Sequence, residues 1–345
     1  MKRTWKIRAL AIAKYLGAFG LARRLSRGGV RILCYHGIWL GDRRFAGDTM
    51  FMHADTFETR MATIRRLGYP VVTLSEAVAA LRGELRLPPS AVVITIDDGW
   101  YGTYSAMRPA LEKYDMPATL YCDTGHLNAQ RPVYHVLARY LLQCSGNGNL
   151  DGPAREAYQR ATDQDLDPAE RAAAVDELKL LLDADHTFEC RTFTYMTADQ
   201  LREFFATPKL DVQLHTHNHT LHDFSPVAIR RELDQNSQAL SELLGVPADH
   251  FRHFCYPSGR TTQSAAQTLR ELGLESATTT SQGIAGKRHE LHLLPRFLDG
   301  DNLSQIEFEA ELSGFMDIVR SLLRPSSTPM AKANRLQQPA PRLGT

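Results

Sequence analysis

The sequence predicts an α/β protein built on a parallel sheet. Short apolar runs alternate with helical segments along most of its 345 residues. Residues 91–96 (AVVITI) show no alternation of polar and apolar side chains, which is typical of a strand buried on both faces. A hydrophobic content of 43% in a chain of this length can fill a substantial core.

Strands and helices are expected in turn from residue 30 onward. The strands should lie where apolar and β-branched residues cluster, at 30–35, 70–74, 91–96, 118–122, 211–214, 253–256 and 276–280. The helices should lie where apolar residues recur at helical spacing, at 57–67, 75–81, 104–114, 197–205, 226–244 and 264–272. Ser75 and Thr197 are the expected N-caps of two of these helices.

Three regions are expected along the chain. Residues 1–29 read as a basic amphipathic leader helix, and residues 30–323 as the main domain. Within that domain, about 126–190 is rich in Ala, Glu, Asp and Arg at helical spacing, which predicts a helical insertion. Residues 324–345 turn to Pro, Ser, Gln and Ala without periodicity, which predicts a disordered tail.

Charge and cysteine usage narrow the class of protein. Lys and Arg number 40 against 39 Asp and Glu, so the basic footprint of a nucleic-acid binder is missing and no nucleic-acid partner is expected. The five cysteines form no CxxC pair, and their odd number argues against a closed disulfide framework. A reducing compartment is therefore expected, and Cys34, Cys122 and Cys255, which lie within apolar strand-like runs, are expected to be buried thiols.

The leader combines cations with an apolar stretch, 9–22, that Lys14 interrupts. This stretch is too short and too broken to span a membrane. Trp5, Leu16 and Phe19 among the cations fit a helix that lies on a membrane surface, and a helix packed on the domain fits equally well. We expect a cytoplasmic protein with peripheral contact at the inner face of the membrane, in preference to a secreted one.

Two adjacent carboxylates, Asp97 and Asp98, come at the end of the buried strand 91–96. Like charges this close raise each other's pKa unless a cation compensates. If Asp98 binds a divalent metal, Asp97 can stay ionised and take a proton from a water molecule. Gly99 is expected to break the strand, so that both side chains reach one site.

A second cluster, His215 and His219, follows the predicted strand 211–214. Imidazole is the commonest metal ligand, and the i, i+4 spacing lets two rings meet one ion. The alternative interpretation is a solvated His-rich loop. One carboxylate and two imidazoles leave coordination positions open, as in hydrolytic sites. Zn²⁺ is the expected metal, and the same ligands accept Co²⁺, Ni²⁺ or Fe²⁺.

These motifs resemble those of the polysaccharide deacetylases, the NodB homology family (carbohydrate esterase family 4). Residues 94–99 (ITIDDG) look like the family's TFDDG motif, and residues 215–219 (HTHNH) look like its H-[ST]-x-x-H motif. Further matches follow in family order at 33–36 (LCYH), 117–121 (PATLY), 254–259 (FCYPSG) and 294–296 (LPR). The resemblance covers about residues 30–298.

The resemblance implies a distorted (β/α) barrel of the NodB type with a helical insertion. It implies Asp97 as general base and Asp98, His215 and His219 as metal ligands. Ser258 matches the position whose backbone N–H serves the family as oxyanion donor, in a turn fixed by proline and glycine.

The sequence also departs from the family pattern. Many members carry Arg where this chain has Cys255, and no convincing equivalent of the Asp-x-x-x-Trp motif is present. The L-x-H motif that supplies a general acid has no clear match either. We expect His36, at the end of strand 30–35, to contact substrate or deliver a proton, with His292 and Arg296 as weaker candidates.

The implied activity is hydrolysis of an N-acetyl group from an amino sugar, in a polysaccharide or a lipid-linked glycan precursor. Deformylation or O-deacetylation of a lipid-linked sugar is an alternative for the same site. A carbohydrate-binding scaffold without catalysis is another, and retention of both aspartates and both histidines counts against it.

Overall fold

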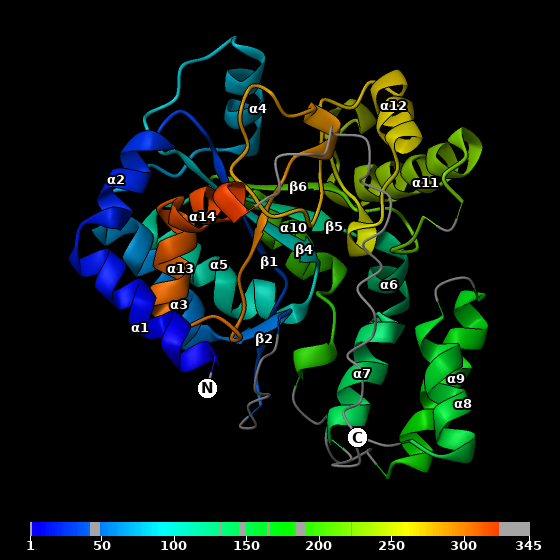
Figure 1. Ribbon diagram of the computed structural model, residues 1–345. Coiled ribbons are helices and arrows are strands. Elements are labelled where there is room, and N and C mark those ends of the chain that lie inside the picture. Colours follow the sequence, from blue (N-terminus) through cyan, green and yellow to red (C-terminus); the bar gives the residue numbers. More distant parts are fainter. Residues whose placement is uncertain are drawn as a thin grey trace.

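A curled, seven-stranded parallel sheet forms the centre of the protein (Figure 1). The computed structural model describes residues 2–41, 49–131, 133–144, 150–163, 166–183, 191–221 and 223–323. The strands are β1 (Arg31–Tyr35), β4 (Val92–Asp98), β5 (Ala118–Cys122), β6 (Leu210–Leu214), β7 (His253–Cys255), β8 (Ser276–Thr278) and β9 (Phe297–Leu298). Their order, β8-β7-β6-β5-β4-β1-β9, describes a distorted half-barrel and confirms the expected fold class.

Helices connect the strands and cover the sheet. Those within the main domain are α3 (Ala54–Arg66), α4 (Leu74–Arg82), α5 (Arg108–Tyr114), α6 (Thr124–Ala129), α7 (Tyr134–Cys144), α8 (Gly152–Thr162), α9 (Pro168–Leu181), α10 (Ala198–Ala206), α11 (Pro226–Leu244), α12 (Gln263–Glu271), α13 (Gln305–Leu312) and α14 (Phe315–Leu323). A π-helical turn, Thr103–Met107, leads into α5. All five residues of β1 and all seven of β4 are buried, as expected for strands covered on both faces.

The segment 70–74 was expected to be a strand, and this prediction is wrong. Only an isolated bridge joins Val71 to Val92, and α4 already begins at Leu74. The N-cap is Thr73, and not Ser75 as expected. The Thr73 hydroxyl accepts a hydrogen bond from the backbone N–H of Glu76, whose carboxylate accepts one from the N–H of Thr73. This capping box places the N-cap two residues before Ser75 and the first helical residue at Leu74.

A two-stranded parallel sheet, β2 (Gly37–Trp39) and β3 (Phe51–His53), was not anticipated. Strands of three residues carry too little periodicity to be recognised. Gly37 lies so close to the Phe51 ring that a Cβ there would stand 2.2 Å from a ring carbon. Phe51 in turn packs edge-on against Trp100, so this small sheet supports the chain just after Asp98.

The predicted leader contains two helices, α1 (Lys2–Tyr15) and α2 (Ala18–Leu25), which meet at Gly17 with φ 81°. Both lie along the outer edge of the molecule beside α13 and α14 (Figure 1). At the other edge, α7, α8 and α9 pack on one another within the segment expected as an insertion. None of the described helices is long and apolar enough to cross a membrane. The predicted tail, 324–345, lies outside the described residues.

Candidate active site

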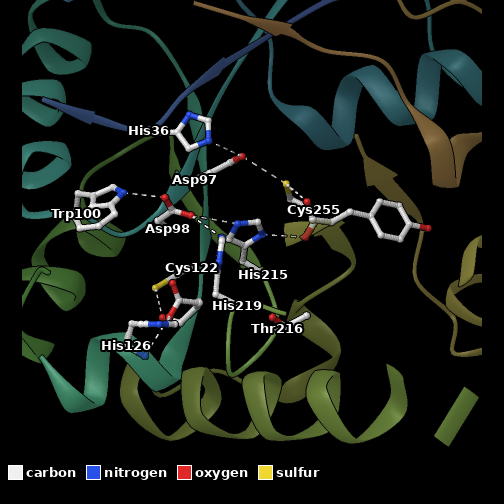
Figure 2. Close-up of polar contacts among 12 residues, drawn as sticks. His36, Asp97, Asp98, Trp100, Cys122, His126, His215, Thr216, His219 and Cys255 are labelled. Carbon is white, nitrogen blue, oxygen red and sulfur yellow. Dashed lines mark hydrogen bonds and ion pairs between the residues drawn. The ribbon is translucent and has the colours of Figure 1, made fainter. Parts of the chain in front are cut away.

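The site lies at the carboxyl ends of the parallel strands, where β4 ends at Asp97 and Asp98. Both carboxyl groups point into the same cluster (Figure 2). Side chains of successive strand residues normally alternate between faces, and the backbone breaks that rule here. Asp98 has φ 79° and Gly99 has φ 112°, so the turn begins one residue before the expected glycine. An aspartate with a left-handed backbone conformation is strained by about 1–3 kcal/mol, and residues strained in this way are found most often at functional sites.

Asp97 is held by a buried arginine. The Arg296 guanidinium donates from Nη1 to Oδ1 and from Nη2 to Oδ2, each at 2.7 Å. Burial by itself would raise the pKa of Asp97, but the charge and hydrogen bonds of Arg296 outweigh burial and lower the pKa to about 2. Asp97 is therefore ionised at neutral pH even though it lies beside a second carboxylate.

Arg296 is held deep in the protein, beside Cys255. Its side chain is fully buried, and its Nε donates to the Thr279 carbonyl at 3.0 Å. Its Nη2 also lies 3.0 Å from the Cys255 sulfur. A guanidinium in this setting does not release a proton, so the interpretation of Arg296 as an acid is wrong. The residue instead orients and ionises Asp97.

Three further groups face the same carboxylate. The sulfurs of Cys34 and Cys255 each lie 3.5 Å from Asp97 Oδ2, and His36 Nε2 lies 3.7 Å from it. Cys34, Cys255 and Cys122 are fully buried free thiols, which confirms the expectation for these three cysteines. The side chain of His36 is 13% exposed, so this imidazole is the member of the group that solvent reaches.

Asp98 faces two imidazoles. His215 Nε2 lies 3.2 Å and His219 Nε2 lies 3.1 Å from Asp98 Oδ1, and all three side chains are buried. The other oxygen, Oδ2, accepts a hydrogen bond of 2.7 Å from the Trp100 indole. Among the described residues, buried Oδ1 has no hydrogen-bond donor. The structure thus brings together the three residues expected as metal ligands (Figure 2).

The chemistry of this trio fits a divalent cation. His215 Nδ1 lies 2.8 Å from the Cys255 carbonyl, which can only accept, so in the neutral ring the proton sits on Nδ1. The lone pair of Nε2 then faces Asp98 Oδ1 directly. Acceptor groups converging within 4.8 Å repel one another unless a cation lies between them. Zn²⁺ takes this combination of nitrogen and oxygen ligands.

Helix α11 holds the histidine loop in place. The backbone N–H of His215 donates to the Asn236 side chain at 2.9 Å, and those of His217 and Asn218 donate to Glu232 at 3.1 and 2.9 Å. Asn236 and Glu232 are buried, and the Asn236 amide also donates to the Cys122 carbonyl on β5. These bonds stabilise a curled loop in which His219 has φ 51°.

A buried set of hydrogen-bonded side chains beside His219 was not predicted from the sequence. Asp123, directly after β5, contacts His126 Nδ1 at 2.9 Å and accepts from the Tyr195 hydroxyl at 2.9 Å. The His126 ring stands edge-on to His219, and His135 stacks on the same imidazole. The available signal was position, since Asp123 follows a strand at the same edge of the sheet as Asp98.

Two expected residues lie apart from the buried cluster. Ser258 follows β7 in a turn with φ 54°, and its side chain is exposed. His292 Nε2 lies 2.8 Å from the Leu274 carbonyl, so its ring is engaged elsewhere. The turn at Ser258 does need its glycine, because a Cβ on Gly259 would stand 2.0 Å from the Thr280 hydroxyl. Whether the Ser258 backbone serves catalysis stays a prediction.

Comparisons with known proteins agree with this geometry. The family model described as "Polysaccharide deacetylase" matches residues 85–277, more than half of the chain. Poly-beta-1,6-N-acetyl-D-glucosamine N-deacetylase of Escherichia coli K12 is 24% identical over 275 residues. That match covers 77% of this chain but only 36% of the relative, so the chain spans about a third of that protein's length.

Solved structures of deacetylases share the fold. The Streptococcus pyogenes deacetylase PplD, solved with acetate, has a TM-score of 0.56 and 19% identity, covering 84% of this chain and 98% of that one. IcaB from Ammonifex degensii has a TM-score of 0.54 and 19% identity, covering 83% and 97% of the two chains. At 19% identity, this similarity shows a shared fold only. The chemistry of this chain has to be argued from the residues of its own site.

Proposed function

This chain belongs to the polysaccharide deacetylase family, and from that membership we propose that it hydrolyses the N-acetyl group of an amino sugar in a glycan. The observation that carries the proposal is the pair of adjacent aspartates with different partners. Among the described residues, Asp98 faces two imidazoles and no Lys or Arg, while Asp97 is ionised by Arg296. The E. coli relative is named for poly-N-acetylglucosamine, which makes a polymer of N-acetylglucosamine the first substrate to test.

Asp98, His215 and His219 would hold a divalent metal, for which Zn²⁺ is our first choice. When bound, such a cation polarises a carbonyl and makes a coordinated water more acidic. Asp97 is placed to accept the proton of the attacking water, because its carboxylate stays ionised and keeps lone pairs beyond those that Arg296 engages. Arg296 fixes the orientation of that carboxylate during the proton transfer.

His36 is our candidate for the acid that protonates the departing amine. Its Nε2 lies 3.7 Å from Asp97 Oδ2, so a proton taken by Asp97 has an imidazole within reach on the solvent side. The backbone N–H of Ser258 is our candidate for oxyanion stabilisation, because its turn follows β7 at the same sheet edge.

Mass spectrometry of acylated sugars tests the proposal. Zn²⁺-loaded protein is incubated with β-1,6-linked N-acetylglucosamine oligomers, with N-formyl oligomers and with O-acetylated oligomers. We expect loss of acetyl from nitrogen and release of acetate. Loss of formyl alone, or of O-acetyl alone, would reassign the acyl group. Sugar binding without any hydrolysis, at full metal loading, would support the scaffold alternative.

A lipid-linked amino sugar is a second candidate substrate. The observation that favours it is the exposed apolar side of α1, where Trp5, Tyr15 and Leu16 face solvent. A polyprenyl carrier keeps its sugar at a membrane surface, so an enzyme that acts on it has to work there. Undecaprenyl-linked N-acetylglucosamine presented in vesicles, compared with the soluble oligomer, tests this option through the ratio of the two kcat/KM values.

A further inference from the structure

Helix α1 packs on the domain through a narrow apolar contact at Leu10 and Ala13, with a lysine on either side. Lys6 lies 2.8 Å from Glu307, and Lys14 pairs with Glu309, both carboxylates belonging to α13. Leu10 is the one buried residue among residues 3–15. A surface helix normally buries its apolar side and exposes its charges. On α1 the larger apolar side chains, Trp5, Ile12 and Tyr15, stay exposed, unlike those of an ordinary surface helix.

The outward side of α1 is apolar and aromatic. Trp5, Ile12 and Tyr15 on α1, and Leu16 directly after it, are 66%, 60%, 90% and 74% exposed. On α2, Leu21 and Leu25 are also exposed. Six of the twelve exposed large apolar residues in the described part of the chain thus lie between residues 5 and 25. A concentration of this kind marks an interaction surface, unlike single apolar residues scattered over the protein.

The charges around this face have one sign. No Asp or Glu precedes residue 42, whereas Arg8, Arg24 and Arg27 are exposed. The Arg8 guanidinium lies 5.9 Å from the centre of the Trp5 ring. Basic side chains beside exposed aromatic residues are the pattern of helices that lie in the interface of an anionic bilayer.

The start of α1 stands on the active-site side of the sheet. Arg3 donates to the Asn302 carbonyl at 2.5 Å, and Asn302 follows the carboxyl end of β9. Since β9 is parallel to β1 and β4, this is the edge at which Asp97 and Asp98 lie. A surface to which α1 binds would therefore lie close to the edge of the sheet that carries Asp97 and Asp98.

We propose that the outer faces of α1 and α2 dock on a membrane surface that contains anionic lipid, with Trp5, Tyr15 and Leu16 entering the interfacial layer. A second copy of the chain is a poorer occupant, because two such faces would set cations against cations. The segment 324–345 is also a poorer occupant, since it contains no Asp or Glu to meet those cations. This binding is separate from the proposed hydrolysis, because the protein can bind lipid when no sugar substrate is present.

Vesicle binding by the full chain tests the proposal. We expect sedimentation with vesicles of phosphatidylcholine and phosphatidylglycerol, weakening as salt rises, and far less with phosphatidylcholine alone. Replacing Arg8, Arg24 and Arg27 with Gln should weaken partitioning roughly 100-fold, at about fivefold for each cation. Changing Trp5, Tyr15 and Leu16 to Ser should weaken it by at least about tenfold.

A matched control changes Leu85, Leu180 and Val227 to Ser, which removes exposed apolar groups elsewhere and should leave binding intact. Trp5 provides a direct signal, because Trp39 and Trp100 are buried. Its emission should shift to the blue when anionic vesicles are added. Unchanged Trp5 emission, or equal binding by the serine variant and the parent, would overturn the proposal. The proposal would also be overturned if the parent protein formed a dimer and the Trp5, Tyr15 and Leu16 changes dissociated it. Acetate release from soluble oligomers, measured separately, should be the same in all these variants.

Discussion

The two halves of the site are Asp97 with its partners and Asp98 with its partners. Both are built around an aspartate, but the charges around the two carboxylates differ in kind. Asp97 meets the permanent cation of Arg296, which donates to both of its oxygens. Asp98, the next residue along β4, meets two imidazoles and an indole, and its Oδ1 has no donor among the described residues. A protein cation therefore balances one carboxylate, and the other is left with a charge and lone pairs that a metal can satisfy.

This contrast teaches how neighbouring carboxylates acquire different roles. The difference does not come from the aspartates but from the elements opposite them. Arg296 comes from the segment before β9, and the histidines come from the loop after β6. Changes on the Asp97 side should reduce rate and leave metal bound, whereas changes on the Asp98 side should release metal.

The largest effect on rate is expected for Asp97→Asn. The amide keeps the shape of the side chain but cannot accept the proton of the attacking water. We expect kcat to fall by roughly 10²–10⁴-fold, the usual contribution of a general base, with bound metal unchanged. Steady-state kinetics on a soluble oligomer, with elemental analysis of the same sample, measures both. Full activity would remove Asp97 from the proposed mechanism.

His36→Ala should lower kcat by about 100-fold and also leave the metal in place. The reason is loss of the imidazole that stands 3.7 Å from Asp97 on the solvent side. His126→Ala is the matched control, because its ring packs on His219 of the other half. That change should weaken metal binding instead. If His126→Ala lost the basic limb of the pH–rate profile and His36→Ala kept it, the acid would belong to the Asp98 side.

Replacing Arg296 should shift the pH dependence of the reaction. Burial raises the pKa of Asp97, and Arg296 is the largest of the groups that together lower it to about 2, so the pKa should rise in Arg296→Gln. A base is active when ionised, so activity should then fall at a higher pH as acid is added. Arg296→Lys restores the charge and should return most of the profile. An unchanged acid limb in the Gln variant would show that the pair does not control the base.

The smallest effect is expected for Asn236, the residue of α11 that holds the loop of His215 and His219 in place. Asn236→Ala removes the acceptor for the His215 N–H and the donor to the Cys122 carbonyl, without touching a ligand side chain. Metal affinity should fall by about 10- to 100-fold, the range for groups that orient ligands. Gln238→Ala, on the exposed side of the same helix, is the control. Equal affinities in the two variants would show that the loop keeps its shape without Asn236.

Much of this site could be predicted because its parts follow strand ends in the sequence. Asp97 and Asp98 come after a run of apolar and β-branched residues, and His215 comes directly after the predicted strand 211–214, so the parallel topology brings them together. Arg296 was harder to place, since it lies 199 residues from Asp97 in the sequence. Its pairing required the curled sheet that places β9 beside β1.

Other features had no sequence signal of their own. The chain of Asp123, His126 and Tyr195 joins residues 72 apart through side-chain hydrogen bonds, which no local pattern encodes. The start of α4 shows a different limit, because Thr73 and Ser75 are both good caps and only the reciprocal bonds with Glu76 decide between them. The orientation of α1 likewise depends on the carboxylates of α13, which pair with Lys6 and Lys14.

Metal titration of Asp97→Asn and Asp98→Asn, side by side with the parent, tests the central claim most directly. The two variants change one atom in adjacent residues of the same strand, so any difference between them reports on their partners. We predict that the parent and Asp97→Asn each bind about one Zn²⁺ per chain with similar affinity, and that Asp98→Asn binds it at least about 100-fold more weakly. Equal loss of Zn²⁺ in both variants, or undiminished binding by Asp98→Asn, would contradict the division of roles between the two aspartates.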